Sequence, residues 1–477
     1  MCLVVALVFW ILGDTAERYF CPVVRTLADR WNLAPATAGV TLLALGNGAP
    51  DVFASLAAAA AAAGATAAAG AIVSAGMFVS GAVVGAVALV AAPFPVDPRP
   101  FRRDVSCYLA AVIVTAVVVA DGKVHAWEAA ALPAYYVAFV GYVVWCDART
   151  DPGAKEPSST ASRLVDRARR WFATRWRERE GGSFGFGFGF GGDSALRRAL
   201  DATTLVCLVA PLEVARRATI PCGDPKRWNR FYACANAALS PLLLTHLVVS
   251  FSGLELGFGG SLGSGGLEFA VGVGMASFAA AAVLWRVTAD DAPPRWWDAN
   301  GLVDAVAFLC SVAWIAAAAR ELTECLAAIG DVLGVTPASL SVTVLAIGNS
   351  LGDLAADVAT ARSGQPTMAV AACFSGPLFN MAVGLGGSFA IATWGRGGDP
   401  LPLAMHPTVA VGFVFLIVGL VATASLVPMR GYVVTRGHGY GLIALYVTYM
   451  ACAVAVEVLT DGGGGGTMSE SAPARWR

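Results

Sequence analysis

Charged residues are scarce in this chain, and their scarcity excludes a soluble globular protein. Asp, Glu, Lys and Arg make up 14% of the 477 residues, while 57% are hydrophobic. Soluble domains carry roughly 25% charged residues. Apolar runs of about 20 residues recur along almost the whole length and can each cross the bilayer as a helix. The runs lack the alternation typical of barrel strands, so the sequence predicts an all-α polytopic membrane protein.

Motifs for enzyme chemistry and for ATP-driven transport are also missing. The 11 Cys form no CxxC pair or Cys/His cluster, which favours small core side chains over metal ligands or disulfides. The four His have no repeated relation to the acids, and no GxxxxGK[ST] phosphate loop is present. We therefore expect neither enzyme activity nor a cofactor. A net charge of −1 gives no reason to expect a nucleic-acid partner. The expected partners are inorganic cations and membrane lipids, and the oligomeric state stays open.

A basic leader segment is absent at the first residues. The apolar run 1–12 begins at once, whereas a signal peptide starts with a positive segment. We interpret the run as the first half of a membrane helix that continues through Phe20. A truncated or mis-started gene model is the alternative, and the sequence leaves both open.

Twelve membrane spans are expected, five before a long polar interruption and seven after it. They cover residues 1–26, 36–62, 67–92, 104–121, 126–146, 232–252, 267–288, 303–329, 336–362, 366–393, 406–427 and 438–459. The domains are a first repeat domain (1–147), a basic cytosolic loop (148–230), two additional membrane helices (231–290), a second repeat domain (302–460) and a disordered tail (461–477).

The basic loop contains two distinct segments. Residues 184–190 (FGFGFGF) cannot build a core, so we predict a disordered linker there. Residues 199–218 are apolar on one side and end near Arg216 and Arg217, which is typical of a helix lying along the membrane interface. The loop either regulates transport or only holds its side of the protein against an anionic membrane.

The distribution of Lys and Arg predicts the orientation. The 148–230 loop is basic, and so are the short turns that would lie on the same side, with Arg99, Arg102, Arg103, Arg362, Arg430 and Arg436. Turns assigned to the other side, at 63–66, 253–265 and 330–335, lack Lys and Arg. The N-terminus is therefore expected outside and the loop in the cytosol.

Two segments repeat each other at a constant offset of 302, because 331 − 29 and 353 − 51 give the same value. The longer motifs span 36–92 and 336–393, and both have an acid at the same repeat position in an apolar span, Asp51 and Asp353. An ionisable residue there costs roughly 2.5–3.5 kcal/mol and indicates a functional site. Seven helix crossings separate the two acids, so the repeats run in opposite directions, as in transporters with a site at the bilayer midplane.

The first motif offers oxygen ligands around a weakened helix. Pro50 has no N–H, so the carbonyl of Gly46 loses its helical partner and can face an ion. Asn47 and Asp51 lie four residues apart, on one helical face. Carbonyl, amide and carboxylate oxygens are the ligands that Ca²⁺ takes.

The second motif offers Asn349, Ser350 and Asp353 in register, and Asp357 lies one turn further along the same face. Asn380, on the following helix, is a plausible secondary ligand. The alternative is that these polar residues only join helices in the membrane. Two acids in register within a repeat that also keeps Gly and Asn favour ion binding.

These motifs resemble the two α-repeats of the cation/Ca²⁺ exchanger superfamily. The resemblance rests on 39–53 (GVTLLALGNGAPDVF), 348–357 (GNSLGDLAAD), 361–366 (ARSGQP) and 376–381 (GPLFNM). It is strongest to the branch with plant cation/calcium exchangers and the mitochondrial sodium/calcium exchanger. It implies a fold of two inverted five-helix repeats with two inserted helices, and Asp51 and Asp353 as the acids that bind Ca²⁺ or Na⁺ in alternation. Asn380 stands where potassium-dependent relatives often carry Asp.

We therefore expect a secondary active antiporter that exchanges Ca²⁺ for Na⁺, or for H⁺ or K⁺. An H⁺-coupled Na⁺ or K⁺ antiporter is the first alternative and a cation channel a remote one, since no filter-like TVGYG segment is present. A vacuolar, endomembrane or plasma membrane location is expected ahead of the mitochondrial inner membrane.

Overall fold

The computed structural model describes residues 2–59, 64–148, 210–224, 228–252, 264–290, 292–294, 297, 301–332, 348, 350–403 and 405–462. The Gly/Phe tract at 184–190, most of the basic loop, residue 349 and the tail beyond 462 lie outside these residues. Residues 461–462, predicted as tail, are the end of the last helix.

The first repeat domain consists of helices at each of the five predicted spans, three of which contain a π-helical segment, written η. They are α1 (Cys2–Thr15), η1 (Ala16–Phe20) and α2 (Cys21–Arg30); α3 (Pro35–Ala38), η2 (Gly39–Leu43) and α4 (Ala44–Ala59); α5 (Gly64–Met77), η3 (Phe78–Val83) and α6 (Val84–Ala91); α7 (Pro98–Ala120); and α8 (Ala126–Ala148).

The second repeat domain follows the same plan after the inserted helices. Its elements are α14 (Leu302–Val332); α17 (Leu351–Arg362); α18 (Pro366–Phe379), η7 (Asn380–Leu385) and α19 (Gly386–Gly395); α20 (Pro407–Met429); and α21 (Arg436–Gly462). Between the repeats lie α11 (Ala210–Thr219), α12 (Arg230–Ser252) and α13 (Ser264–Val287). Within the described residues, seven helices are long and apolar enough to cross a membrane. The predicted all-α, multi-pass membrane fold is confirmed.

The π-helical segments reveal the repeat in the backbone itself. η3 covers Phe78–Val83 and η7 covers Asn380–Leu385, and both bounds differ by 302. Each lies in the third helix of its repeat and adds the same local widening of the helical turn. Two equal deviations from α-helix at equivalent positions indicate one shared backbone plan.

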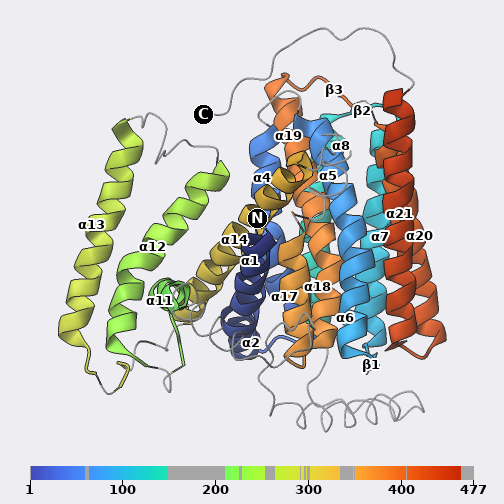
Figure 1. Cartoon of the computed structure of the whole chain (residues 1–477). Helices are drawn as coiled ribbons and strands as arrows, with labels where there is room; N and C mark the ends of the chain where they lie inside the picture. Colours follow the sequence, from blue (N-terminus) through green and yellow to red (C-terminus); the bar gives the residue numbers. More distant parts are fainter. Residues whose placement is uncertain are drawn as a thin grey trace.

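Four two-residue strands show how the repeats are related. β1 (Phe94–Pro95) pairs with β4 (Val433–Val434), and β2 (Lys123–Val124) pairs with β3 (Leu401–Pro402), both antiparallel. β1 and β3 each follow the third helix of their repeat, yet they lie at opposite ends of the bundle (Figure 1). The repeats therefore run in opposite directions through the molecule, as predicted.

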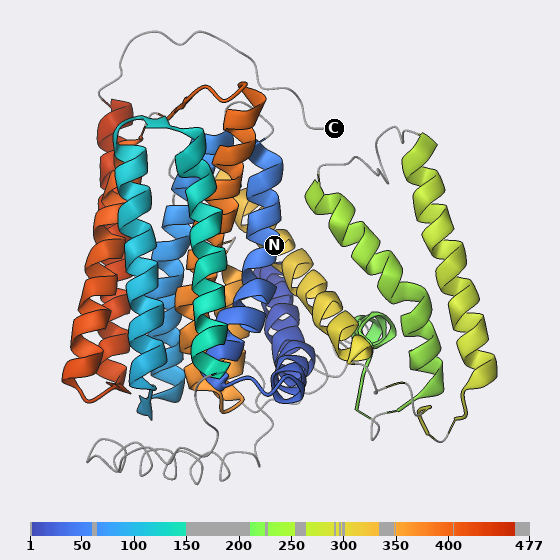
Figure 2. The same cartoon turned by 180° about the vertical axis from the view of Figure 1, so that it is seen from behind.

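Burial separates central helices from outer ones. In the most apolar stretch of the helix 366–395, 94% of the residues are buried, against 33% in α20 and 28% in α21. The α18–η7–α19 helix thus lies in the middle of the bundle, and α20 and α21 expose apolar faces suited to lipid. The α12–α13 hairpin stands to one side of the bundle in both views (Figure 2).

The helix α11, from the basic loop, is held against the first helix by the buried side chain of an arginine. Arg216 is 0% exposed, forms ion pairs with Asp14 Oδ2 at 2.8 Å and Glu213 Oε2 at 2.9 Å, and donates a hydrogen bond to Thr15 Oγ1 at 3.0 Å. Its guanidinium also lies over the ring of Trp10. The described part of the segment predicted to lie along the interface, from residue 210, is therefore packed into the protein through one of its two arginines.

Candidate cation-binding site

The two repeated acids come from helices that both pack against the central α18–η7 helix. Asp51 lies on α4 and Asp353 in the first turn of α17. α4 contacts α18, η7 and α17, while α17 contacts α18. Inverted repeats thus bring together two side chains that are 302 positions apart in the sequence.

Asn380 links the acid of the first repeat to the second repeat. Its amide Nδ2 donates a hydrogen bond of 2.9 Å to Asp51 Oδ2. Asn380 is the first residue of η7 and is 5% exposed. Its position in the first repeat is occupied by Phe78, so this amide exists in one repeat only.

Asp357 is held by donors from two other helices. Asn47 Nδ2 donates to its Oδ1 at 3.1 Å, and the Cys373 thiol donates to its Oδ2 at 3.1 Å. The side chain is 1% exposed. Asn47 therefore faces the opposite repeat, and both oxygens of Asp357 have a partner before any ion binds.

Asp353 interacts electrostatically with both of the other acids, Asp51 and Asp357. Its side chain is 7% exposed, while that of Asp51 is half-buried. Three carboxylates in a mostly buried place repel one another strongly, and a bound cation relieves that repulsion.

Two buried polar atoms near these acids have no hydrogen-bond partner. They are Ser350 Oγ and Asn380 Oδ1. Ser350 is 0% exposed and immediately precedes α17 without capping it through its side chain. Leaving a buried polar atom unpaired costs about 1–3 kcal/mol. Oxygens left unpaired beside carboxylates fit a hard cation, which takes both as ligands.

The helix break predicted in the first motif is absent. α4 runs continuously from Ala44 to Ala59, through Gly46 and Pro50. A proline removes a single backbone hydrogen bond, and neighbouring helices support the rest of the turn. The irregular turn is η2, just before α4. In the second motif Ser350 lies in a turn from which α17 begins.

The glycines of the first motif permit close helix packing. A Cβ on Gly48 would lie 2.5 Å from Asn380 Oδ1 and 2.8 Å from the Phe379 ring. A Cβ on Gly46 would lie 3.0 Å from the rings of Phe20 and Phe308. This packing accounts for a glycine at position 46, and ion binding by its carbonyl stays a prediction.

The sequence missed one part of this arrangement, because Cys373 was interpreted as a core side chain. Among the described residues, no group of three His, Cys, Asp or Glu is close enough to hold a metal ion by itself. A cation held by these acids would therefore also need amide or hydroxyl oxygens as ligands. Asn349 lies outside the described residues.

Inverted repeats, a central helix and facing acids define a secondary transporter of the inverted-repeat class. The model of the family "Sodium/calcium exchanger protein" matches residues 1–145 and 303–455, the two repeat domains. The chain belongs to this family, whose members are ion exchangers and not enzymes.

Similar proteins agree with this assignment over nearly the whole chain. The chain is 38% identical to cation/calcium exchanger 5 of Arabidopsis thaliana, over 94% of this chain and 80% of that protein. It is 31% identical to the human mitochondrial sodium/calcium exchanger protein, with the same coverage. A solved structure of the sodium-calcium exchanger NCX_Mj, soaked with Na⁺ and Sr²⁺, matches with a TM-score of 0.52 at 13% identity and covers 94% of this chain and 99% of that chain. At this identity the match concerns the fold alone.

Proposed function

We propose that this protein exchanges Ca²⁺ for Na⁺, or for H⁺, across a membrane by alternating access. The single site lies between the repeats and is formed by Asp51, Asp353 and Asp357, with oxygens of Ser350 and Asn380. Asn349 is added to these ligands on the basis of the sequence motif alone. The names of the similar plant and mitochondrial proteins favour Ca²⁺ as one of the ions.

The observation that carries the proposal is the meeting of acids from both repeats beside unpaired oxygens. Asp51 and Asp353 interact electrostatically, and Ser350 Oγ and Asn380 Oδ1 are buried without partners. Two or three carboxylates neutralise one divalent cation, or several monovalent ones. Because both kinds of ion need the same carboxylates, they compete for the site, and competition couples their fluxes without ATP.

Asp357 contributes to this site mainly as a fixed negative charge. Both of its oxygens already accept hydrogen bonds, from Asn47 and Cys373. Among the described residues, no side chain donates a hydrogen bond to Asp353 or to the second oxygen of Asp51, so these oxygens are better placed to bind an ion directly.

Radiotracer flux in proteoliposomes tests the proposal, with Ca²⁺, Na⁺, K⁺ and H⁺ gradients varied one at a time. We expect Asp51→Asn and Asp353→Asn each to lower Ca²⁺ exchange at least tenfold, since a loss of about 1.4 kcal/mol already changes ion affinity tenfold. Exposed Asp121→Asn, in the turn before β2, is the matched control and should exchange normally. Near-normal exchange by either site variant refutes the assignment.

The gradients also decide between the proposal and its alternative. Ca²⁺ uptake that depends on an opposing Na⁺ or H⁺ gradient supports the proposal. Na⁺ or K⁺ flux driven by H⁺, with no Ca²⁺ transport, would instead assign a monovalent cation antiporter. Conductive flux without counter-ion dependence would assign a channel. A vacuolar, endomembrane or plasma membrane location remains part of the proposal.

A further inference from the structure

A cavity of about 720 Å³ lies between the first helix, α11 with the turn after it, and the start of α12. None of the six residues placed at the cation site above with described side chains lines it. Its volume is within the range of small-molecule sites. It is near the end of the bundle where α2 and α11 lie, the end that also carries β1 (Figure 1).

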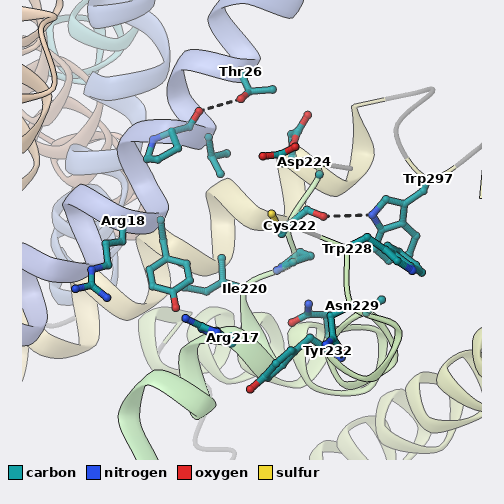
Figure 3. A pocket seen from close by; sticks show the side chains of 18 of the residues that line it. Arg18, Thr26, Arg217, Ile220, Cys222, Asp224, Trp228, Asn229, Tyr232 and Trp297 are labelled. Atoms are coloured by element: carbon teal, nitrogen blue, oxygen red, sulfur yellow. Dashed lines mark hydrogen bonds between the residues drawn. The ribbon is translucent and has the colours of Figure 1, made fainter. Parts of the chain in front are cut away.

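One side of the cavity is cationic. Arg18 and Arg217 lie on this side (Figure 3). The Nε of each arginine forms an ion pair with a neighbouring acid, Arg18 with Asp14 at 2.9 Å and Arg217 with Glu213 at 2.8 Å. Both side chains are more than half exposed. Since a guanidinium has five N–H donors, each keeps donors available for a phosphate oxygen.

The other side is aromatic. Trp228 and Trp297 lie there, with ring centroids 5.2 Å apart and planes at 82° (Figure 3). Trp297 is fixed by a hydrogen bond from its Nε1 to the carbonyl oxygen of Cys222. An indole face attracts an alkylammonium group by cation–π attraction.

A buried oxygen on α12 needs a hydrogen-bond donor. Asn236 lines the cavity, is 5% exposed, and its Oδ1 has no partner. It lies one turn beyond Tyr232, which also lines the cavity, on the same helical face. A ligand N–H would satisfy this oxygen, whereas a quaternary ammonium could not.

The net charge of the lining limits the ligand further. Three arginines line the cavity (Arg18, Arg30 and Arg217), and so do three acids (Glu213, Asp224 and Asp304). Equal numbers of the two charges give no excess that would favour a polyanion. Trp and Tyr beside Arg at the ends of membrane helices are typical of the lipid headgroup region.

From this chemistry we infer that the cavity binds the headgroup of phosphatidylethanolamine. The phosphate meets Arg18 and Arg217, and the primary ammonium lies against Trp228 and donates to Asn236 Oδ1. The lipid would connect the first helix of the transport core with α12.

Native mass spectrometry of the full chain tests the inference. Detergent-purified protein is given equimolar phosphatidylethanolamine, phosphatidylcholine and phosphatidylglycerol. We expect the wild type to retain one phosphatidylethanolamine about fivefold over either of the others, a preference that a single satisfied hydrogen bond can supply. Equal retention of all three lipids, or a preference for the anionic or the choline lipid, overturns the inference.

Variants locate the lipid. Asn236→Leu should reduce the preference to near one, while Asn236→Asp, which keeps an acceptor, should retain it. Trp228→Leu should lower the retention of phosphatidylethanolamine and phosphatidylcholine together, because both ammonium groups are attracted by a ring face. Trp394→Leu is the matched control, because Trp394 is an 86% exposed tryptophan on α19, at the opposite end of the bundle. An unchanged preference in Asn236→Leu contradicts the site. Asp51→Asn should bind the lipid normally, so the result is independent of ion exchange.

Discussion

At the residue scale, the acids of the cation site are organised by side chains from the opposite repeat. Asp51, of the first repeat, accepts a hydrogen bond from Asn380 of the second. Asp357, of the second, accepts one from Asn47 of the first. Any relative movement of the repeats must change both contacts. The site is therefore sensitive to the motion that alternating access requires.

Cys373 is the residue whose role is least apparent from the sequence. Its thiol donates to Asp357 Oδ2, and the equivalent position in the first repeat is Ala71. We expect Cys373→Ala to weaken the apparent affinity for Ca²⁺ by about tenfold, since a buried oxygen loses its partner at a cost of about 1–3 kcal/mol. Cys373→Ser keeps a donor and should behave much like the wild type. The measurement is the half-saturating Ca²⁺ concentration of exchange, separated from the maximal rate.

The control for this prediction is Cys310→Ala, because Cys310 is also fully buried on α14, but its thiol interacts with the Ser240 hydroxyl and not with an acid. An equal loss of affinity in Cys310→Ala and Cys373→Ala would attribute the effect to packing. An unchanged affinity in Cys373→Ala would show that the thiol does not position Asp357.

Gly48 determines how closely α4 approaches η7. A Cβ there would lie 2.5 Å from Asn380 Oδ1, so Gly48→Ala must displace the amide that binds Asp51. Overpacking of this kind costs about 1–3 kcal/mol, and we expect Ca²⁺ exchange to fall about tenfold. Gly376→Ala, on the adjoining α18, adds a Cβ with nothing within 4 Å and should be neutral. Equal activity of the two variants in the flux assay would contradict the close approach.

At the scale of elements, helix positions were more predictable than helix contacts. The spans were predicted from the length of the apolar runs and from the charged residues between them. Every described membrane helix coincides with a predicted span. The contact of α11 with the first helix was not predictable, because an Arg near the end of a short amphipathic segment usually faces water or lipid headgroups. Arg216 can be buried because it pairs with Asp14 and Glu213, and these pairs are visible only in the structure. Likewise, a Pro inside an apolar helix predicted a break, although packing keeps α4 continuous.

Electrostatics keeps the α11 contact charged at neutral pH. Burial raises the pKa of Glu213, but hydrogen bonds from Arg217 and Tyr19 and the charge of Arg216 outweigh it. The pKa of Glu213 is therefore lowered from its ordinary value of 4.5. A lowered carboxylate pKa stabilises the folded state above about pH 4.5, and this contribution is lost as the pH falls below that value.

Replacement of Arg216 should detach α11 from the first helix. Arg216→Leu leaves two acids without their buried partner, and breaking such a pair costs about 3–5 kcal/mol. We expect a clearly lower midpoint of thermal unfolding in detergent. Arg320→Leu is the control, because Arg320 is 60% exposed and its nearest acid, Glu324, is 3.8 Å away. An exposed pair contributes roughly 0–1 kcal/mol. Similar midpoints for the two variants would show that the buried pair does not stabilise the protein.

At the scale of the whole molecule, the repeat offset predicted more than the positions of the two acids. It also predicted opposite directions for the two halves, and the strands at opposite ends of the bundle agree (Figure 1). What the offset could not predict is the asymmetry of the site. Asp357, Cys373 and Asn380 have Ser55, Ala71 and Phe78 as equivalents. The second repeat therefore supplies most of the polar groups, and this difference lies in individual side chains that a symmetric pattern ignores.

The same architecture predicts which end faces the cytosol. Five arginines flank the paired strands β1 and β4 (Arg99, Arg102, Arg103, Arg430 and Arg436), whereas the turns at β2 and β3 carry Lys123 and Arg396. Basic turns remain in the cytosol. In a vacuolar, endomembrane or plasma membrane location, a glycosylation acceptor inserted in a hydrophilic spacer at Lys123 should be glycosylated, since that turn would face the lumen or the exterior. The same insertion beside Tyr432 should not be. A glycan-sensitive mobility shift measures both. Modification at Tyr432 would reverse the orientation, and modification at neither position would contradict the proposed membrane location.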